Sequence, residues 1–270
     1  MRSILFIATL LHALCAWPAD VPESEDSEIW QKIKSSFFPG RTIQQDLSGE
    51  VLTLRAPHRA QDASTVPVAI STRLPQSAQR YVEKLYLIID KNPSPVAGIF
   101  SFTPESGHAD IETRVRVEEY SHLRAVAQLN DGSTYMAVRY IKAAGGCSSP
   151  TGTAPDFEHF KARVRIRTED KVTLGESSTV QLMIQHPNTS GLAKDQLTQL
   201  FIPAYYVRTI HVTYAGQPIL SADVDFSISE NPNFRFHFVP KAAGELKAII
   251  TDTKEREWEG KVEIVPEPRS

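Results

Sequence analysis

The sequence predicts an all-β protein of two immunoglobulin-like β-sandwich domains with a short N-terminal helix. Three observations indicate this class. The 270 residues are enough for about two domains of ~100–150 residues each. Eighteen prolines and short apolar runs favour many strands and turns over long helices. A stretch rich in glycine, serine and proline, residues 143–155, separates two strand-rich halves and is predicted to be a flexible linker that carries a cysteine.

The first 19 residues have the composition of a secretory signal peptide. Arg2 precedes an apolar run from Ile4 to Leu14, which is too short to span a bilayer, and small residues follow. Cleavage after Ala16 or Ala19 is plausible, although neither gives a clean small-residue motif. We therefore expect export to the periplasm and no membrane span in the mature chain. The formal net charge of −3, without a basic cluster, gives no indication of a nucleic-acid partner.

Residues 27–142 are predicted to form the first sandwich domain, opened by a helix from Glu28 to Phe38. Ser27 is its expected N-cap, and Pro39 ends it. Ile29, Trp30, Ile33 and Phe37 fall on one helical face. Seven short strands follow, with a hairpin turn at 130–132. Their expected ranges are 50–54, 67–71, 84–89, 98–103, 109–116, 122–128 and 134–140.

Residues 156–266 are predicted to repeat this architecture as a second sandwich domain, without visible sequence repetition. A hairpin turn is expected at Ala215-Gly216, and the segment from His186 to Gly191 reads as a turn-rich loop. Asn188 begins a glycosylation sequon, a short pattern that often occurs by chance. The expected strands are 161–167, 179–185, 205–214, 217–224, 234–239, 245–251 and 258–265.

The linker contains the most distinctive residue of the chain. The other of the two cysteines, Cys15, lies in the signal peptide, so Cys147 is the only thiol expected in the mature protein. Its neighbours Gly145, Gly146, Ser148 and Ser149 are small, which predicts an exposed thiol on a mobile arm. Such a thiol is able to link two chains as a disulfide dimer. The alternative is an ordinary linker with an incidental cysteine.

No pattern in the sequence indicates catalysis or metal binding. A catalytic cysteine requires a positioned base, and none of the eight histidines shares a recognisable protease motif with Cys147. A blue-copper site needs two histidines and usually a methionine near the cysteine, and His159 alone follows at some distance. His186, in a loop, is more typical of a turn residue than of a ligand. We therefore expect a protein that is not an enzyme and has no cofactor.

Several motifs resemble a known family. In the first half these are Leu87-Ile-Ile-Asp-Lys-Asn-Pro-Ser-Pro-Val-Ala, Phe102-Thr-Pro, Glu112-Thr-Arg-Val-Arg-Val, Asp131-Gly and Gly145-Gly-Cys, which resemble SoxY, the sulfur-carrying subunit of the periplasmic sulfur-oxidation system. In the second half they are Gln185-His-Pro-Asn-Thr-Ser-Gly-Leu, Ile202-Pro-Ala-Tyr-Tyr-Val and Ser229-Glu-Asn-Pro-Asn-Phe-Arg-Phe, which are similar to its partner SoxZ. The chain therefore resembles a SoxYZ fusion.

The resemblance implies a carrier whose Cys147 holds a thiosulfate-derived or related sulfur adduct, with Gly145 and Gly146 as its arm. Expected partners are a haem c sulfur ligase and a sulfate thiohydrolase, or a quinoprotein alcohol dehydrogenase system served by a related carrier. Two features differ from the family: Ser148 and Ser149 replace glycines, and the arm is tethered at both ends. The rival hypotheses are a binding or chaperone-type module and a thiol oxidoreductase, the latter weakened by the lack of a second cysteine.

Overall fold

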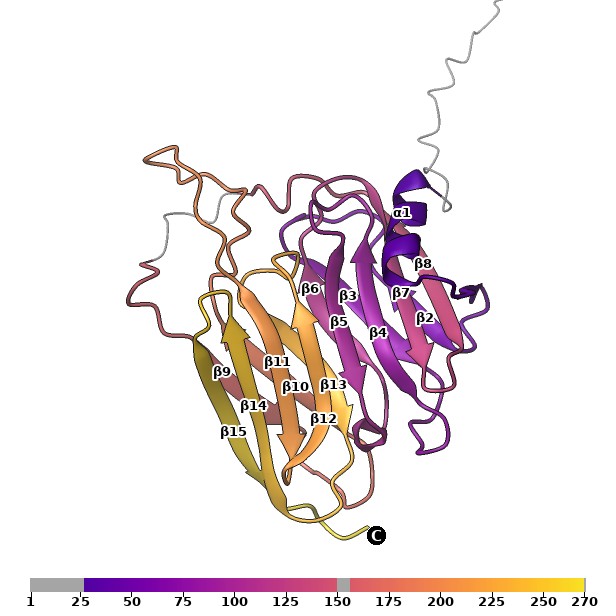
Figure 1. Ribbon diagram of the computed structural model, residues 1–270. Coiled ribbons are helices and arrows are strands. Elements are labelled where there is room, and N and C mark those ends of the chain that lie inside the picture. The colour runs from indigo at the N-terminus through magenta and orange to yellow at the C-terminus, as the bar shows by residue number, and fades with distance from the viewer. Residues whose placement is uncertain (1–26, 150–155, 270) are drawn as a thin grey trace, which may run out of the picture.

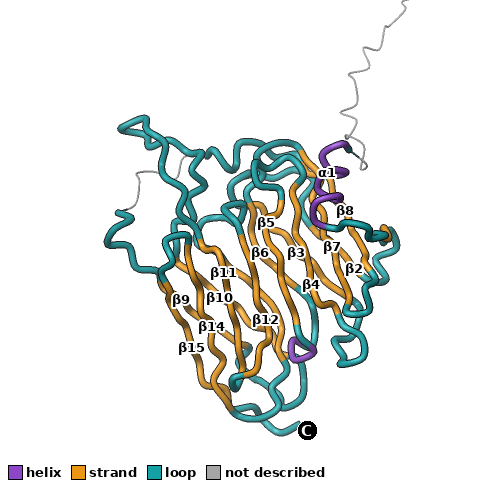
Figure 2. The backbone as a smooth tube through the Cα atoms, in the orientation of Figure 1, coloured by secondary structure: helices purple, strands orange, loops and turns teal. Residues whose placement is uncertain are grey.

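Two stacked β-sheets run through both halves of the chain in the computed structural model, which describes residues 27–149 and 156–269 (Figures 1 and 2). The first half supplies one helix, a short 3₁₀ turn and eight strands. They are α1 (Glu28–Phe37), β1 (Gln44–Gln45), β2 (Leu52–Arg55), β3 (Val66–Thr72), β4 (Val82–Ile89), β5 (Val96–Phe102), η1 (Pro104–Ser106), β6 (Ile111–Val115), β7 (Ser121–Leu129) and β8 (Thr134–Ile141). Every strand expected in this half is present, and the short β1 and η1 are additional.

The second half supplies seven strands, one for each that the sequence predicts. They are β9 (Arg163–Thr168), β10 (Ser178–Gln185), β11 (Val207–Tyr214), β12 (Gln217–Val224), β13 (Asn233–Phe238), β14 (Gly244–Asp252) and β15 (Glu257–Ile264). No helix among the described residues is long and apolar enough to cross a membrane. Two immunoglobulin-like sandwiches and one short helix are therefore the architecture, as the sequence predicts.

The two sandwiches are joined edge to edge through both sheets. The nine-stranded sheet has the order β1-β8-β7-β4-β5-β12-β11-β14-β15, and the six-stranded sheet has the order β2-β3-β6-β13-β10-β9. In the first, β5 of one half pairs antiparallel with β12 of the other, with Phe100 opposite Ala222. In the second, β6 meets β13 at Glu112 and Arg235. Backbone hydrogen bonds, rather than side-chain packing alone, thus hold the halves together.

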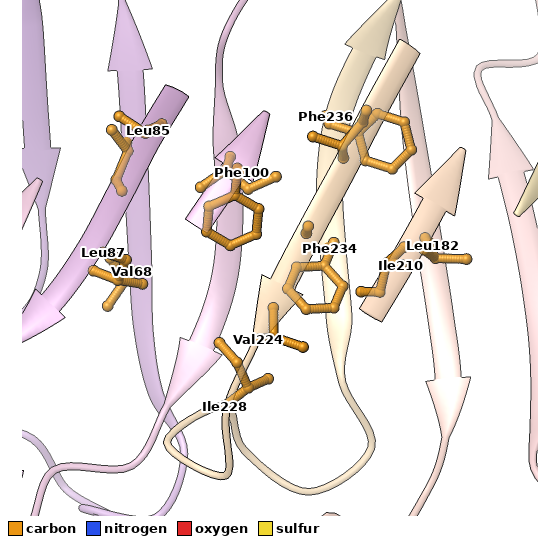
Figure 3. Close-up of a cluster of buried hydrophobic side chains, with 14 of the residues drawn as sticks. Val68, Leu85, Leu87, Phe100, Leu182, Ile210, Val224, Ile228, Phe234 and Phe236 are labelled. Atoms are coloured by element: carbon orange, nitrogen blue, oxygen red, sulfur yellow. The ribbon is translucent and has the colours of Figure 1, made fainter. Parts of the chain in front are cut away.

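A single hydrophobic core continues across the junction. Strands of the six-stranded sheet alternate buried residues with more exposed ones, so that one face of this sheet turns inward. In the nine-stranded sheet, β4 and β7 are buried along most of their length. Phe100 from the first half and Phe234 from the second pack edge to face, with ring centroids 6.0 Å apart, and both are almost fully buried (Figure 3). Because burial of apolar area is the main stabilising contribution to folding, neither half is expected to be independent of the other.

Helix α1 covers the outer face of the nine-stranded sheet. The Ser27 hydroxyl accepts a hydrogen bond from Trp30 N–H at 3.2 Å, which confirms the predicted N-cap. Trp30 and Ile33 are buried against this sheet, whereas Phe37, which the helical spacing placed on the same face, is not. Phe37 is 44% exposed, and Phe38 is buried in its place because the helix ends at residue 37 and the chain turns there.

Candidate functional site

The cysteine lies in a turn that follows β8 and folds back onto one end of the sandwich. Gly145 has a positive φ of 78°, a conformation that glycine adopts without the steric cost of a side chain. Its N–H donates to the carbonyl oxygen of Glu118 at 2.8 Å, and Gly146 N–H donates to that of Val117 at 2.9 Å. These bonds attach the residues that we call the Cys147 turn, Gly145–Ser148, to the segment after β6.

The Glu118 side chain fixes the tip of this turn. Its Oε2 accepts hydrogen bonds from the N–H groups of Cys147 at 2.8 Å and of Ser148 at 3.1 Å. Its Oε1 accepts a third hydrogen bond from the Ser148 hydroxyl at 2.8 Å. A carboxylate that accepts bonds from successive N–H groups is a strong anchor, because hydrogen bonds to a charged acceptor are about twice as strong as neutral ones. One side chain thereby holds three donors of the turn.

The second half of the chain also contacts the turn. The Ser190 hydroxyl donates to the carbonyl oxygen of Cys147 at 2.5 Å. Ser190 belongs to a loop in which Asn188 is fully buried. Nδ2 of Asn188 donates to the carbonyl oxygen of Ile228 at 2.9 Å. Asn188 therefore has a structural role, and its side chain is not accessible for glycosylation in the folded protein. The Cys147 turn lies where both halves of the fusion meet.

Close packing explains why residue 146 is a glycine. A Cβ atom built on Gly146 would overlap the carbonyl oxygen of Ala63, which itself accepts a hydrogen bond from Val117 N–H at 2.9 Å. Gly145, in contrast, has open space around its Cα. The turn thus approaches the backbone of the sandwich more closely than any residue with a side chain would allow.

The prediction of an exposed thiol was wrong for this conformation. Cys147 is only 1% exposed, and it is the free cysteine of the described chain. Burial raises the pKa of its thiol to about 12, with a further increase from the nearby carboxylates of Glu118 and Asp225, while the Arg116 guanidinium opposes the shift. The thiol is therefore fully protonated at neutral pH and has little nucleophilic character.

The small residues around Cys147 were predicted to form a mobile arm, but they form a tight, docked turn instead. Gly145 and Gly146 permit a tight turn and a close approach, and the Ser148 hydroxyl makes a side-chain hydrogen bond. Ser149 is half-buried next to them. The remaining linker residues, 150–155, lie outside the described residues. Glu118 was missed because it is 29 residues away in the chain and belongs to no recognisable motif.

Arg116 occupies the interior beside the turn. It is 3% exposed, and its Nη1 donates to the carbonyl oxygens of Phe226 at 2.8 Å and Ile228 at 2.6 Å. Burial lowers the pKa of this guanidinium, and the cysteine opposes that shift. Because the carbonyls come from the second half and Arg116 from the first, this side chain helps to fix the junction below the cysteine.

A second cluster of polar groups surrounds His186 in the second half. His186 Nε2 has no hydrogen-bond partner and lies 3.8 Å from Oδ2 of the buried Asp252. Burial lowers the pKa of His186 to about 4, so the ring is neutral at physiological pH. Arg256 Nε lies 3.4 Å from the same oxygen and supplies the counter-charge of Asp252. Within the described ranges no group of histidine, cysteine and carboxylate side chains is arranged to hold a metal ion.

Two known families match consecutive parts of the chain. The family described as sulfur oxidation protein SoxY matches residues 35–147, and the family described as sulphur oxidation protein SoxZ matches residues 166–263. Together they cover more than three quarters of the chain, and the first match ends at Cys147. No curated protein matches the chain.

Three solved structures are among those similar to this chain. The sulfur carrier protein SoxY from Chlorobium limicola f thiosulfatophilum is 24% identical with a TM-score of 0.35, covering 42% of this chain and 90% of that one. The superoxide reductase (neelaredoxin) from Ignicoccus hospitalis is 20% identical with a TM-score of 0.30, covering 34% and 79%. Red sea bream transglutaminase is 14% identical with a TM-score of 0.28, covering 92% and 34%.

The two tandem matches, on two sandwiches that share both sheets, define a carrier protein of sulfur oxidation. The chain belongs to the SoxY and SoxZ families and is a SoxY–SoxZ fusion.

Proposed function

We propose that Cys147 is the carrier residue of this fusion, and that it holds a sulfur-containing intermediate as a covalent adduct for partner enzymes. The observation that supports this most directly is the position of the thiol. Cys147 ends the SoxY-matched region and lies on a turn held mainly by polar contacts, outside every strand of the two sheets. The turn is able to detach without breaking a β-ladder. The protein is then a carrier and not an enzyme.

The docked conformation is a resting state in this proposal. A thiol with a pKa of about 12 and 1% exposure is a poor nucleophile, since the thiolate is the reactive species. Loading therefore requires the Cys147 turn to leave its site against the segment after β6. In water the thiol returns toward its ordinary pKa of ~8.5, which raises the thiolate fraction at neutral pH by orders of magnitude.

The chemistry of loading indicates what the partner has to supply. Joining a cysteine thiol to the outer sulfur of thiosulfate forms a sulfur–sulfur bond and releases one proton and two electrons. In this proposal the partner enzyme accepts the two electrons. A haem c sulfur ligase provides such an acceptor, and a sulfate thiohydrolase would then remove the terminal sulfonate as sulfate with water. The adduct is the only non-protein group that the proposal requires.

The proposal also includes location. Residues 1–19 have the composition of a signal peptide, which directs the carrier to the periplasm, and N-terminal sequencing of the mature protein tests this. These residues lie outside the described ranges. Sequencing that finds Met1 on the protein from its own cells would contradict export through this segment.

A second candidate function is a binding or chaperone-type module, such as one that serves a quinoprotein alcohol dehydrogenase system. The burial and raised pKa of Cys147 favour it, because an incidental cysteine is typically buried and inert. Mass spectrometry of protein isolated from its own cells separates the two functions. Persulfide or thiosulfonate masses on Cys147 support the carrier, and their absence under sulfur-oxidising growth supports the module. A mixed disulfide with one protein would favour a thiol oxidoreductase.

The matching functional test is the Cys147→Ser variant. Serine cannot form a persulfide or thiosulfonate, so a carrier loses its pathway activity at unchanged protein abundance. The protein itself stays folded, because the turn contributes no strand to either sheet. We expect a loss of about 1 kcal/mol at most, which lowers the melting temperature by roughly 2–4 °C for a chain of this size. Full pathway activity in the variant would assign the function to the sandwich and not to the thiol.

A further inference from the structure

The outer face of the six-stranded sheet has an unusual charge distribution. Its strands contain seven charged residues, and all of them are exposed. Six are arginines and one is a glutamate, with no lysine and no aspartate. We call the surface formed by these six arginines the arginine face. The six are Arg55, Arg114, Arg163, Arg165, Arg167 and Arg235.

The nine-stranded sheet provides the contrast within the same molecule. Its strands carry positive and negative residues in similar numbers, namely Lys84, Arg124, Arg139, Arg208, Lys247 and Lys261 against Glu83, Asp223, Glu245, Asp252, Glu257, Glu259 and Glu263. Several pair directly, such as Lys247 with Glu259 at 2.6 Å. The chain as a whole has a net charge of −3. The positive charge of the arginine face is therefore local and is not a consequence of composition.

Most of this charge is uncompensated inside the protein. Glu112 and Arg235 form an ion pair at 3.2 Å across the junction of the two halves. For the other five arginines, no carboxylate within the described ranges lies at ion-pair distance. Arg163, Arg165 and Arg167 alternate along β9 and therefore lie on the same face of that strand. Their like charges repel one another, so the folded protein gains nothing from this arrangement by itself. An anionic partner removes the repulsion.

Two adjoining hollows give the arginine face a shape that a partner can occupy. They have volumes of about 500 and 430 Å³ and share Arg114 and Asn233 as lining residues. Arg55 and Arg235 line the first hollow, whereas Arg163 and Arg165 line the second. Five of the six arginines, all except Arg167, therefore border a continuous depression over the junction between β6 and β13.

This depression reaches the end of the sandwich at which the cysteine docks. The second hollow is bordered by Asn231, whose N–H donates to the carbonyl oxygen of His186 at 2.9 Å. The loop that begins at His186 continues to Ser190, which holds the carbonyl oxygen of Cys147. On the first-half side, Arg114 precedes Arg116 and the Glu118 anchor by only a few residues. A protein bound over the arginine face would thus extend to the Cys147 turn.

We propose that the arginine face is the docking surface for a protein partner whose contact surface is acidic, and that this partner is an enzyme that loads or unloads Cys147. The inference rests on the proposed carrier function for the identity of the partner. Arginine suits carboxylates because its planar guanidinium binds them through two parallel hydrogen bonds. A positive surface also accelerates association with a negative one by long-range attraction.

Other occupants fit the face less well. None of the exposed large hydrophobic side chains of the described chain lies in these six strands, so nothing is available to insert into a lipid bilayer. The aromatic residues of β13, Phe234, Phe236 and Phe238, are buried, which leaves no stacking surface for single-stranded nucleic acid. Charge on the edge strands β2 and β9 would discourage unwanted sheet pairing, but that reason does not apply to Arg114 and Arg235 on interior strands.

Two charge-matched variants test the proposal in a Cys147→Ser background, so that no adduct influences binding. The face variant is Arg114→Glu with Arg165→Glu. The control is Arg208→Glu with Lys261→Glu on the nine-stranded sheet, which changes the net charge equally. The probes are a purified haem c sulfur ligase and a purified sulfate thiohydrolase of the sulfur-oxidation system, and stopped-flow measurements give their association rate constants.

At an ionic strength of ~0.05 M we expect the face variant to associate at least about tenfold more slowly with one of these enzymes, and the control to change by less than about twofold. At ~0.5 M salt the difference should largely disappear, because the Debye length falls below the width of the contact. Circular dichroism confirms that both variants are folded. Equal rates for face and control variants would overturn the proposal, as would failure of both enzymes to bind the parent protein.

Two further measurements distinguish a protein partner from a membrane, and failure of the docking surface from failure of the carrier function. Vesicles of phosphatidylglycerol and phosphatidylcholine should bind the Cys147→Ser parent protein and the face variant equally. Stronger binding of the parent protein would assign the arginine face to a membrane and overturn the proposal of a protein partner. Adducts on Cys147 are measured separately in the wild-type chain. If the enzymes bind through the arginine face but no adduct forms, the carrier function fails while the docking surface stands. If adducts form but the face variant binds normally, only the docking surface fails.

Discussion

The carboxylate of Glu118 accepts hydrogen bonds from the backbone N–H groups of Cys147 and Ser148, at 2.8 and 3.1 Å, across 29 and 30 residues of chain. This contact joins the end of the sheet to the turn that carries the sole described thiol. It requires no strand pairing, so its strength sets how often the thiol is docked and not whether the protein folds. The first predictions concern this equilibrium.

Removal of the anchor is expected to expose the thiol. In Glu118→Ala the turn loses three hydrogen bonds to a carboxylate, which weakens docking by roughly 1–3 kcal/mol after allowance for solvent at the surface. Since 1.4 kcal/mol corresponds to a factor of ten, Cys147 should react with Ellman's reagent roughly ten to a hundred times faster at neutral pH.

The matched control is Glu119→Ala, which removes the exposed carboxylate of the next residue. Its reaction rate should equal that of the wild type. A Glu118→Ala protein that reacts as slowly as the wild type, with unchanged circular dichroism, would show that other contacts hold the turn.

A single methyl group at residue 146 should have a similar effect by a steric route. In Gly146→Ala the new Cβ collides with the carbonyl oxygen of Ala63, which belongs to the backbone and cannot move aside cheaply. The turn therefore undocks. Purified without reductant, this variant should contain more disulfide-linked dimer than the wild type, as non-reducing gel electrophoresis measures.

Gly145→Ala is the comparison, because residue 145 has space for a Cβ and loses only the ease of its positive φ, a cost of roughly 1 kcal/mol. It should lie between the wild type and Gly146→Ala in both dimer content and thiol reactivity. Equal behaviour of the two alanine variants would contradict the steric explanation.

The pH dependence of thiol reactivity follows from the raised pKa. The docked thiol has a pKa of about 12, whereas a solvated thiol has a pKa of ~8.5. Between these values the undocked turn binds fewer protons than the docked one, so docking is stable below the lower pKa and weakens progressively as the pH rises toward the upper one. Rising pH therefore both undocks and ionises the cysteine.

Measured by iodoacetamide alkylation, the wild-type rate should continue to increase well above pH 9. The rate for Gly146→Ala should level off near the ordinary thiol pKa, because its cysteine is already in solvent. A wild-type profile that levels off near pH 8.5 would mean that the docked state is a minor one in solution.

The shared sheets make a prediction about the two halves. Cleavage of the chain between residues 149 and 156 should leave both fragments in one complex, because β5 pairs with β12 and β6 with β13, and the Phe100–Phe234 contact lies in one core. Size-exclusion chromatography without denaturant should give a single peak with the mass of the intact chain. Two separate folded fragments would contradict the continuous sandwich.

The sequence by itself determined the local structure of this protein. Alternation of apolar and polar residues placed the strands to within a few residues, since a strand exposes successive side chains on opposite faces. The turn expected at Ala215-Gly216 is present, with positive φ at both residues. Ser27 was identified as the N-cap because its hydroxyl can satisfy a free N–H of the first helical turn. The motifs also indicated the family, and they singled out Cys147 as the candidate carrier residue.

Only the tertiary structure decided how those parts meet. Which strand of one half pairs with which strand of the other depends on long-range backbone hydrogen bonds, and alternation within β5 or β12 carries no information about the partner. The burial of Cys147 likewise depends on contacts between residues that are distant in the sequence. Its small neighbours are compatible with a free arm or with a tight turn, and the carboxylate of Glu118 and the close approach of Gly146 to Ala63 select the turn. Burial of a thiol is a property of what surrounds it in space, and its sequence neighbours do not determine that.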